Sequence, residues 1–109
     1  MKIYELLIEM VKRVCALSRK VQQHDPDLAR QMRRACTSVP LNAVEGWHGH
    51  GGNRVARFNA AMGSARETLA CLDVAVAVGY LREAEVNAER DRIDHIVAVM
   101  WRLSRARKS

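Results

Sequence analysis

The stretch "VARFNAAMGSARETLACLDVAVAVG", residues 55–79, decides the fold class. Its apolar positions are separated by alternating steps of three and four residues, which places them on one face of a long helix. These positions are Val55, Phe58, Met62, Ala65, Leu69, Leu72, Val76 and Gly79. Such a seam is typical of helices that pack lengthwise against one another. We therefore expect a helix that begins after Asn53 and is ended by Gly79 in a left-handed conformation.

The same periodicity recurs on both sides of this stretch, and no part of the sequence has a strand pattern. Two helices are predicted before it, over residues 2–23 and 26–45, with Asp25 as the N-cap of the second and Pro26 at its first position. A fourth helix is predicted to begin near Glu83 and to end in the C-terminal arginines. The sequence thus predicts an all-α, antiparallel up-down-up-down four-helix bundle that forms a single domain over residues 1–109.

Pro40 falls inside the second predicted helix. An interior proline removes a backbone hydrogen bond and costs about 3 kcal/mol. Thr37, Ser38 and Asn42 can form local hydrogen bonds around the resulting kink, which favours a continuous but bent helix. The alternative is a helix that stops near Ser38, followed by a separate turn over "NAVEG".

The composition is strongly basic. The net charge is +6, and 14 of the 18 basic residues are arginine, a side chain that binds phosphate and carboxylate groups through a planar fork. This bias favours an anionic partner, although an arginine-rich codon usage gives the same composition. Cys15, Cys36 and Cys71 contain no CxxC pair, which argues against a disulfide framework or a zinc site. With no signal peptide or membrane span in the sequence, we expect a cytoplasmic protein with reduced thiols and no membrane partner.

Two of the histidines lie close together in the sequence and are candidate metal ligands. Glu45 and His48 have the Glu-x-x-His spacing used in di-iron bundles, but such a site needs a second pair, which the sequence lacks. His48 and His50 also follow Gly46, where we expect the second helix to stop. No serine, histidine and acid form a recognisable catalytic motif. We therefore expect no metal, no cofactor, no catalytic residue and no enzymatic activity.

Positive charge gathers at one end of the predicted bundle, where the N-terminus, the turn after the second helix and the C-terminus meet. Arg54 and Arg57 lie in the first turn of the third helix, where the helix dipole disfavours a cation. Together with the glycine-rich turn before them, they predict an exposed site for nucleic acid or another anion. Its expected residues are Arg54, Arg57, Arg102, Arg105, Arg107, Lys108, His48 and His50. The alternative is a solvated loop without a function.

The first and fourth helices carry more apolar surface than a lone bundle needs. A larger core would explain this, but wide apolar faces also bury against partners. We expect a homo-oligomer whose interface includes Tyr4, Ile8, Val11, Val99 and Trp101.

The motifs "LARQMRRACTSVPLNAVEGW", "GSARETL" and "VGYL" make residues 28–81 resemble a known family. It is the bacterial four-helix-bundle family that includes the protein encoded in intervening sequences of large-subunit ribosomal RNA genes. The matching positions are Gln31, Arg33, Arg34, Ala35, Ser38, Pro40, Asn42, Ala43, Glu45, Gly46, Trp47, Gly63, Ser64, Glu67, Gly79, Tyr80 and Leu81. The sequence departs from the family pattern at "HGHGGN", where the family has a basic stretch, and at Arg82, where it has serine.

The resemblance implies a four-helix bundle that assembles into five-fold rings, and it supplies no catalytic residues. One relative, the accessory variability protein of diversity-generating retroelements, works with a reverse transcriptase and nucleic acid. The sequence therefore favours a non-enzymatic ring, most simply a pentamer, that binds RNA or DNA through its basic end and has a reverse transcriptase or another protein as a possible partner. The alternative is a protein–protein scaffold that does not bind nucleic acid.

Overall fold

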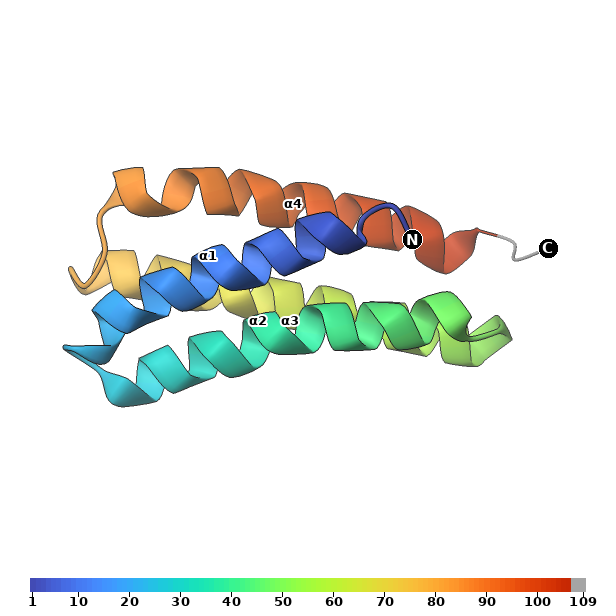
Figure 1. Ribbon diagram of the computed structural model, residues 1–109, viewed down its shortest axis with the longest axis horizontal. Coiled ribbons are helices and arrows are strands. Elements are labelled where there is room, and N and C mark those ends of the chain that lie inside the picture. The colour runs from blue at the N-terminus through green and yellow to red at the C-terminus, as the bar shows by residue number, and fades with distance from the viewer. Residues whose placement is uncertain (107–109) are drawn as a thin grey trace.

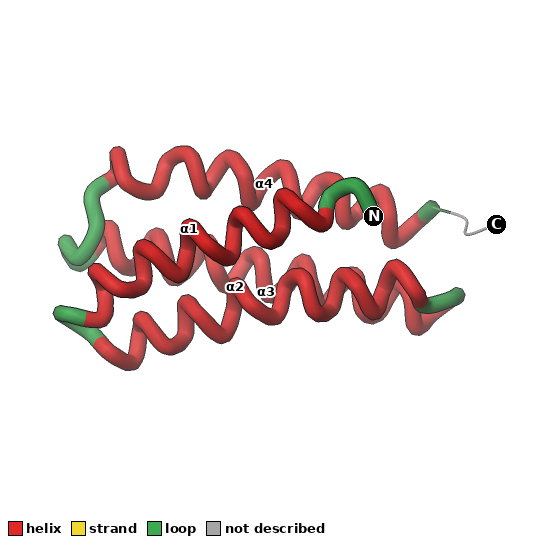
Figure 2. The backbone as a smooth tube through the Cα atoms, viewed as in Figure 1, coloured by secondary structure: helices red, strands yellow, loops and turns green. Residues whose placement is uncertain are grey.

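The computed structural model describes residues 1–106, which form four antiparallel helices joined by short turns (Figure 1). The helices are α1 (Tyr4–Gln22), α2 (Pro26–His48), α3 (Gly51–Ala77) and α4 (Glu83–Arg105). Figure 2 shows that the turns lie at the two ends of an elongated bundle measuring 47 × 23 × 19 Å. The predicted all-α up-down-up-down architecture is confirmed.

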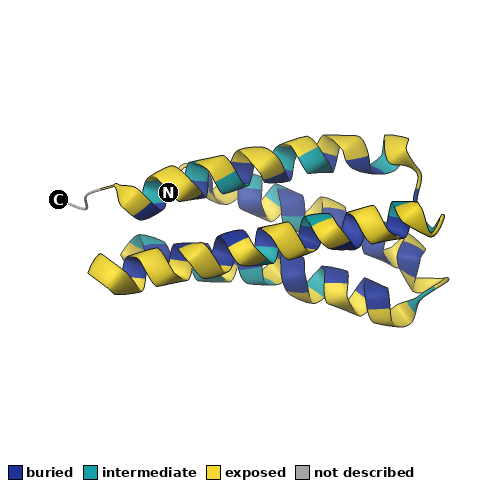
Figure 3. Cartoon of the chain, turned by 180° about the vertical axis from the view of Figure 1, so that it is seen from behind, coloured by how far each residue is buried: buried dark blue, intermediate teal, exposed yellow. Residues whose placement is uncertain are grey.

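One hydrophobic core runs between the helices. Each helix packs against its neighbours in the sequence, and α1 also packs against α4, so α1 and α3 lie diagonally opposite each other. The buried residues form a stripe along the inner face of each helix (Figure 3). The largest fully buried side chains are Phe58, Leu7, Met10, Met32, Leu72, Ile93, Ile96, Met100, Val14, Val21, Val39 and Val86. The seams that the sequence predicted therefore supply most of the core, apart from positions such as Val55, which is exposed.

Several predicted helix boundaries are confirmed by their capping contacts. The Asp25 carboxylate accepts a hydrogen bond of 3.0 Å from the Leu28 N–H, and Pro26 opens α2. Gly79 has φ +86°, the left-handed conformation that ends a helix at low steric cost for glycine. Arg82 precedes α4, and its N–H donates to the Glu85 carboxylate at 2.9 Å. A carboxylate in the first turn therefore caps α4 without the serine typical of the family.

Two boundary predictions were wrong at the turn between α2 and α3. Gly46 does not stop α2, which continues to His48, and α3 begins at Gly51 instead of after Asn53. The reason is a tertiary contact: a Cβ at Gly46 would lie 2.8 Å from the Phe58 ring. This glycine lets α3 pack closely against α2, and the chain reverses only beyond it.

Pro40 lies inside a continuous helix, as predicted, and the alternative with a break near Ser38 is excluded. Local hydrogen bonds surround it. Asn42 Nδ2 donates to the Ser38 carbonyl at 3.0 Å, and Thr37 Oγ1 donates to the Arg33 carbonyl at 2.8 Å. Pro40 itself is buried, so its ring contributes to the core.

None of the helices within residues 1–106 has both the length and the apolar character that crossing a bilayer requires.

Candidate nucleic-acid interface

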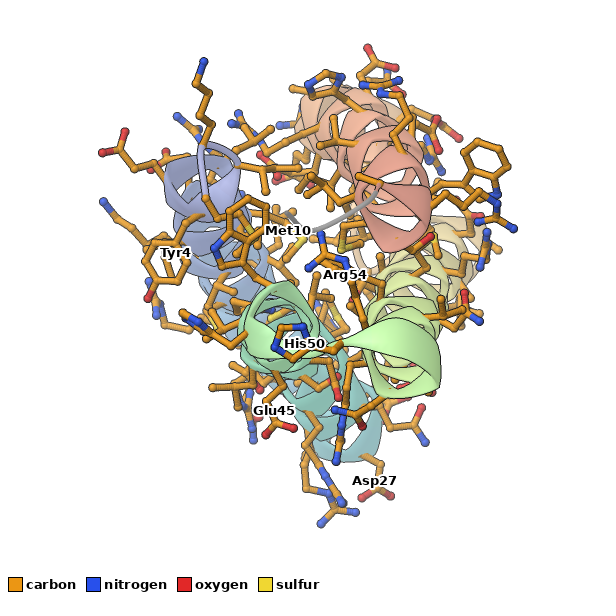
Figure 4. The ribbon with its side chains drawn as sticks, turned by 90° about the vertical axis from the view of Figure 1, so that its right-hand side faces the viewer. Tyr4, Met10, Asp27, Glu45, His50 and Arg54 are labelled. Atoms are coloured by element: carbon orange, nitrogen blue, oxygen red, sulfur yellow. The ribbon has the colours of Figure 1, made fainter. Side chains whose placement is uncertain are left out.

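The expected anion site lies where the two termini and the α2–α3 turn meet, at one end of the bundle (Figure 1). Figure 4 looks directly onto this end. His50 lies at its tip, Glu45 and Tyr4 lie toward the outside, and Arg54 points into the middle of the bundle. The arrangement places most of the predicted residues at one end, but it separates Arg54 from the rest.

Arg54 is buried, with 6% of its surface exposed. Its Nε and Nη2 atoms donate to the Leu103 carbonyl at 3.3 and 3.0 Å, and Nη1 donates to the carbonyls of Gly46 and Trp47 at 3.2 and 3.0 Å. The guanidinium carbon lies 5.5 Å from the ring centroid of Trp47 and 5.2 Å from that of Phe58. The prediction that Arg54 is exposed was therefore wrong.

The physical reason is that Arg54 serves the ends of two other helices. Gly46 and Trp47 lie in the last turn of α2, and Leu103 lies in the last turn of α4. The last carbonyls of a helix have no partner within it and carry the negative end of its dipole. A cation is unfavourable at the positive start of α3, but here it also lies against the negative C-terminal ends of α2 and α4, where it is favourable. The unusual position of Arg54, in the first turn of a helix and after a glycine-rich turn, does mark a residue with a specific role. That role is to cap the C-terminal ends of α2 and α4.

Arg57 remains at the surface, but it has an acidic partner. Its Nε lies 3.1 Å from Glu45 Oε2, and its Nη1 donates to Asn42 Oδ1 at 3.5 Å. Glu45 and Asn42 are on α2, so this cluster links α2 to α3. An anion that bound Arg57 would have to compete with the Glu45 carboxylate.

The family motif acts along this same α2–α3 contact. Gly46 gives room to Phe58, and the Ser38 hydroxyl donates to the Ser64 hydroxyl of "GSARETL". With the Arg57 cluster, these contacts join α2 to α3 at three levels. These residues of the motif therefore hold α2 against α3 in this chain.

The last turn of α4 carries two cations, Arg102 and Arg105, that have no acidic partner within residues 1–106. Arg102 is exposed and forms no ion pair there. The Arg105 guanidinium stacks 4.0 Å above the Trp101 ring, and its Nη1 donates to Ser104 Oγ at 3.1 Å. His48 and His50 are exposed at the turn, whereas the predicted Arg107 and Lys108 lie outside the described residues.

The expected interface residues divide into two groups. Tyr4, Ile8 and Trp101 are exposed, to 44%, 37% and 50%. Val11 and Val99 are half-buried and pack against the core. Leu41, which was not predicted, is the most exposed large apolar side chain within residues 1–106, at 69%. Leu41 lies among polar positions of α2, so the helical periodicity of apolar residues did not indicate it.

Two hollows accompany these features. A hollow of about 310 Å³ lies beside Tyr4 and is lined by Met1, Tyr4, Val44, Trp47 and His48. A groove of about 590 Å³ lies between α2 and α3. In the part of the chain that is described, no three histidine, cysteine or acidic side chains gather in a way that could hold a metal ion.

A family model for the 23S rRNA-intervening sequence protein matches residues 1–102. The chain belongs to this family. The match extends the resemblance seen at residues 28–81 to all four helices, so the family assignment rests on the whole bundle.

A solved structure from Bacteroides thetaiotaomicron has the same fold. It is described as a protein of unknown function from the S23 ribosomal protein family, and it superposes with a TM-score of 0.85 at 16% sequence identity. The alignment covers 95% of this chain and 99% of that one. No curated protein matches the chain. The comparisons therefore establish the family and the fold, and they assign no biochemical activity.

Proposed function

We propose that this member of the family is a non-enzymatic, self-assembling bundle whose basic end binds the phosphates of RNA or DNA. The observation that carries the proposal is the unbalanced charge at that end. Within residues 1–106, Lys2, Arg102 and Arg105 have no acidic partner there, and Glu5 is the only acid at that end without a basic one. Exposed, unpaired arginines attract a polyanion without the cost of breaking an existing ion pair.

This proposal revises the set of contact residues. Arg54 is left out because its donors are used inside the bundle, and Arg57 is secondary because Glu45 already pairs with it. Arg102 and Arg105 become the main ligands, with His48 and His50 beside them at the turn.

Self-assembly is supported by two apolar patches on opposite sides of the bundle. Tyr4 lies about three turns before Cys15 on the same face of α1, and Cys15 contacts Cys36 of α2. Trp101 lies about three turns after Arg90 on the same face of α4, and Arg90 pairs with Asp73 of α3 at 2.9 Å. Tyr4 thus belongs to the α1–α2 side, and Trp101 belongs to the α3–α4 side.

Both patches are at the same end of the bundle. A copy that places its Trp101 in the hollow beside a neighbour's Tyr4 therefore lies next to that neighbour without a shift along the bundle axis. A rotation that divides the full circle, repeated without a shift, closes a ring instead of building a filament. We take five subunits as the expected size because the family resemblance implies it. A ring also brings several basic ends together, so weak phosphate contacts sum to a useful affinity.

A salt titration of RNA and DNA binding tests the nucleic-acid proposal. Arg102→Gln with Arg105→Gln removes two unpaired cations from the basic end. The matched control, Arg19→Gln with Arg66→Gln, removes two exposed cations that have no partner within residues 1–106 and lie away from that end. Affinity should fall steeply with salt, with log K falling by roughly 0.9 per decade of salt for each phosphate neutralised on duplex DNA. The Arg102→Gln/Arg105→Gln variant should reduce the dependence of log K on salt, and the Arg19→Gln/Arg66→Gln control should leave it unchanged.

Equal losses from the two pairs, or no binding at about 50 mM salt, would refute the proposal. The second outcome would favour the alternative function, a protein scaffold. That alternative is supported by the exposed Tyr4, Leu41 and Trp101 side chains, which suit a protein partner as well as a second copy.

Assembly is tested separately, without nucleic acid, by mixing two variants. If unlike patches meet, Tyr4→Glu and Trp101→Glu should each give a monomer of 12.3 kDa by light scattering. Their equimolar mixture should give a dimer and nothing larger, because each pair of chains keeps one intact contact. Val78→Glu, an exposed position at the other end of the bundle, is the control and should leave assembly unchanged. Assembly that survives either of the first two variants alone would show that the unlike patches do not meet.

A further inference from the structure

Two of the three cysteines face each other across the contact between α1 and α2. The Sγ atoms of Cys15 and Cys36 are 4.0 Å apart. A disulfide requires about 2.05 Å between its sulfurs, so the two atoms need to approach by about 2 Å. Bond formation in the folded protein requires that rotation of the two side chains supplies this movement while the helices stay packed.

The two thiols have different surroundings. Cys15 is half-buried, whereas Cys36 is fully buried and its Sγ donates to the Arg33 carbonyl at 3.4 Å. Burial raises the pKa of Cys36 to about 12, and the neighbouring Cys15 thiol adds to this effect. Cys36 is therefore a protonated thiol in the resting protein, and a solvent-borne oxidant meets Cys15 first.

We propose that Cys15 and Cys36 form an oxidation site that a hydroperoxide converts into an internal disulfide, locking α1 to α2. The Cys15 thiol releases its proton and its sulfur attacks the peroxide, so the O–O bond breaks and Cys15 becomes a sulfenic acid. The alkoxide that leaves takes up the released proton and becomes an alcohol. The Cys36 sulfur then attacks the Cys15 sulfur, the S–S bond forms and the S–O bond breaks. The hydroxide that leaves takes up the Cys36 proton and becomes water. Two thiols and one hydroperoxide thus give one disulfide, one alcohol and one water, with two electrons passing to the peroxide.

Cys71 provides a control within the same chain. It is buried on α3 and lines the α2–α3 groove, and burial, followed by the nearby Glu67 carboxylate, raises its pKa. It makes no hydrogen bond to another sulfur within residues 1–106. The proposal therefore assigns the reaction to one pair and leaves the third thiol free.

The bond has a consequence for stability. It closes the loop that runs from Cys15 through the α1–α2 turn to Cys36, which reduces the freedom of the unfolded chain. A loop of this size raises Tm by roughly 10 °C when the native geometry accepts the bond. A disulfide formed only after unfolding would give no such rise.

The test treats the reduced full chain with excess cumene hydroperoxide under native conditions. Intact mass should fall by about 2 Da as two thiol hydrogens are lost, and one free thiol should remain. Trypsin should release a peptide of residues 14–19 joined to one of residues 35–54. Tm should rise, and dithiothreitol should reverse both changes.

Cys15→Ser and Cys36→Ser should each abolish the internal bond, and Cys71→Ser should leave it intact. Three remaining thiols, a bond that includes Cys71, disulfides only between chains, or an internal bond without a rise in Tm would each overturn the proposal.

Discussion

Replacing Arg54 should destabilise the bundle, although its position in the first turn of α3 resembles that of a surface cation. Arg54→Met keeps an unbranched apolar side chain but removes the guanidinium donors that reach the carbonyls of Gly46, Trp47 and Leu103. Gly46 O and Leu103 O keep one backbone bond each, from Gly49 N and Ala106 N. The loss is therefore partial at these two carbonyls.

The magnitude follows from these contacts. A hydrogen bond to a charged group contributes about 1.5–3 kcal/mol, and three carbonyls lose one. Removing a buried guanidinium also relieves its desolvation, which offsets part of that sum. We expect a loss of about 3 kcal/mol, which is large against the roughly 5–15 kcal/mol that stabilises an ordinary domain. Arg54→Lys keeps the charge but not the planar fork, so it should lose about half as much.

Urea unfolding followed by circular dichroism measures this change. With an m-value of roughly 1–3 kcal/mol/M, the midpoint of Arg54→Met should fall by roughly 1–3 M. The control is Arg57→Met, which breaks an exposed pair with Glu45 and should cost less than about 1 kcal/mol. Equal effects of the two substitutions would refute the capping role of Arg54, as would a stable Arg54→Met variant that loses nucleic-acid binding.

Three further predictions concern packing and charge. Gly46→Ala should destabilise the bundle and disturb the α2–α3 turn, because its Cβ meets the Phe58 ring at 2.8 Å; an unchanged Tm would contradict this. Pro40→Ala should retain or raise the helicity measured by circular dichroism, because α2 already continues through Pro40; a loss of helicity would contradict it. Burial raises the pKa of Glu89, partly opposed by Arg92 and Arg13, so its contribution to stability is greatest below the unfolded pKa and is lost as pH rises through the folded one. Urea unfolding of Glu89→Gln can be measured between about pH 4 and 7, a range that begins just below the ordinary glutamate pKa of about 4.3. The stability of the variant should gain on that of the natural chain as pH rises, and a difference independent of pH would refute this.

The sequence by itself determined the local structure because the signals involved are local. The seam of residues 55–79 specified a long helix through its spacing, and Asp25 and Gly79 specified helix ends through contacts or torsions within a few residues. Pro40 was also predicted correctly, since the groups that surround it lie on the same turn of α2. These interactions are the same wherever the helix lies in the fold.

The tertiary structure decided what the site residues do. Whether Arg54 binds an external anion or internal carbonyls depends on where the ends of α2 and α4 lie, and no local pattern contains that information. The predicted end of the second helix at Gly46 was wrong for a similar reason. The close approach of Phe58 from α3 explains why a glycine lies inside α2, and this contact cannot be seen in the local sequence. The positive charge of the chain could be counted from its sequence, but the charges left unpaired at the basic end emerge only when the four helices are brought together.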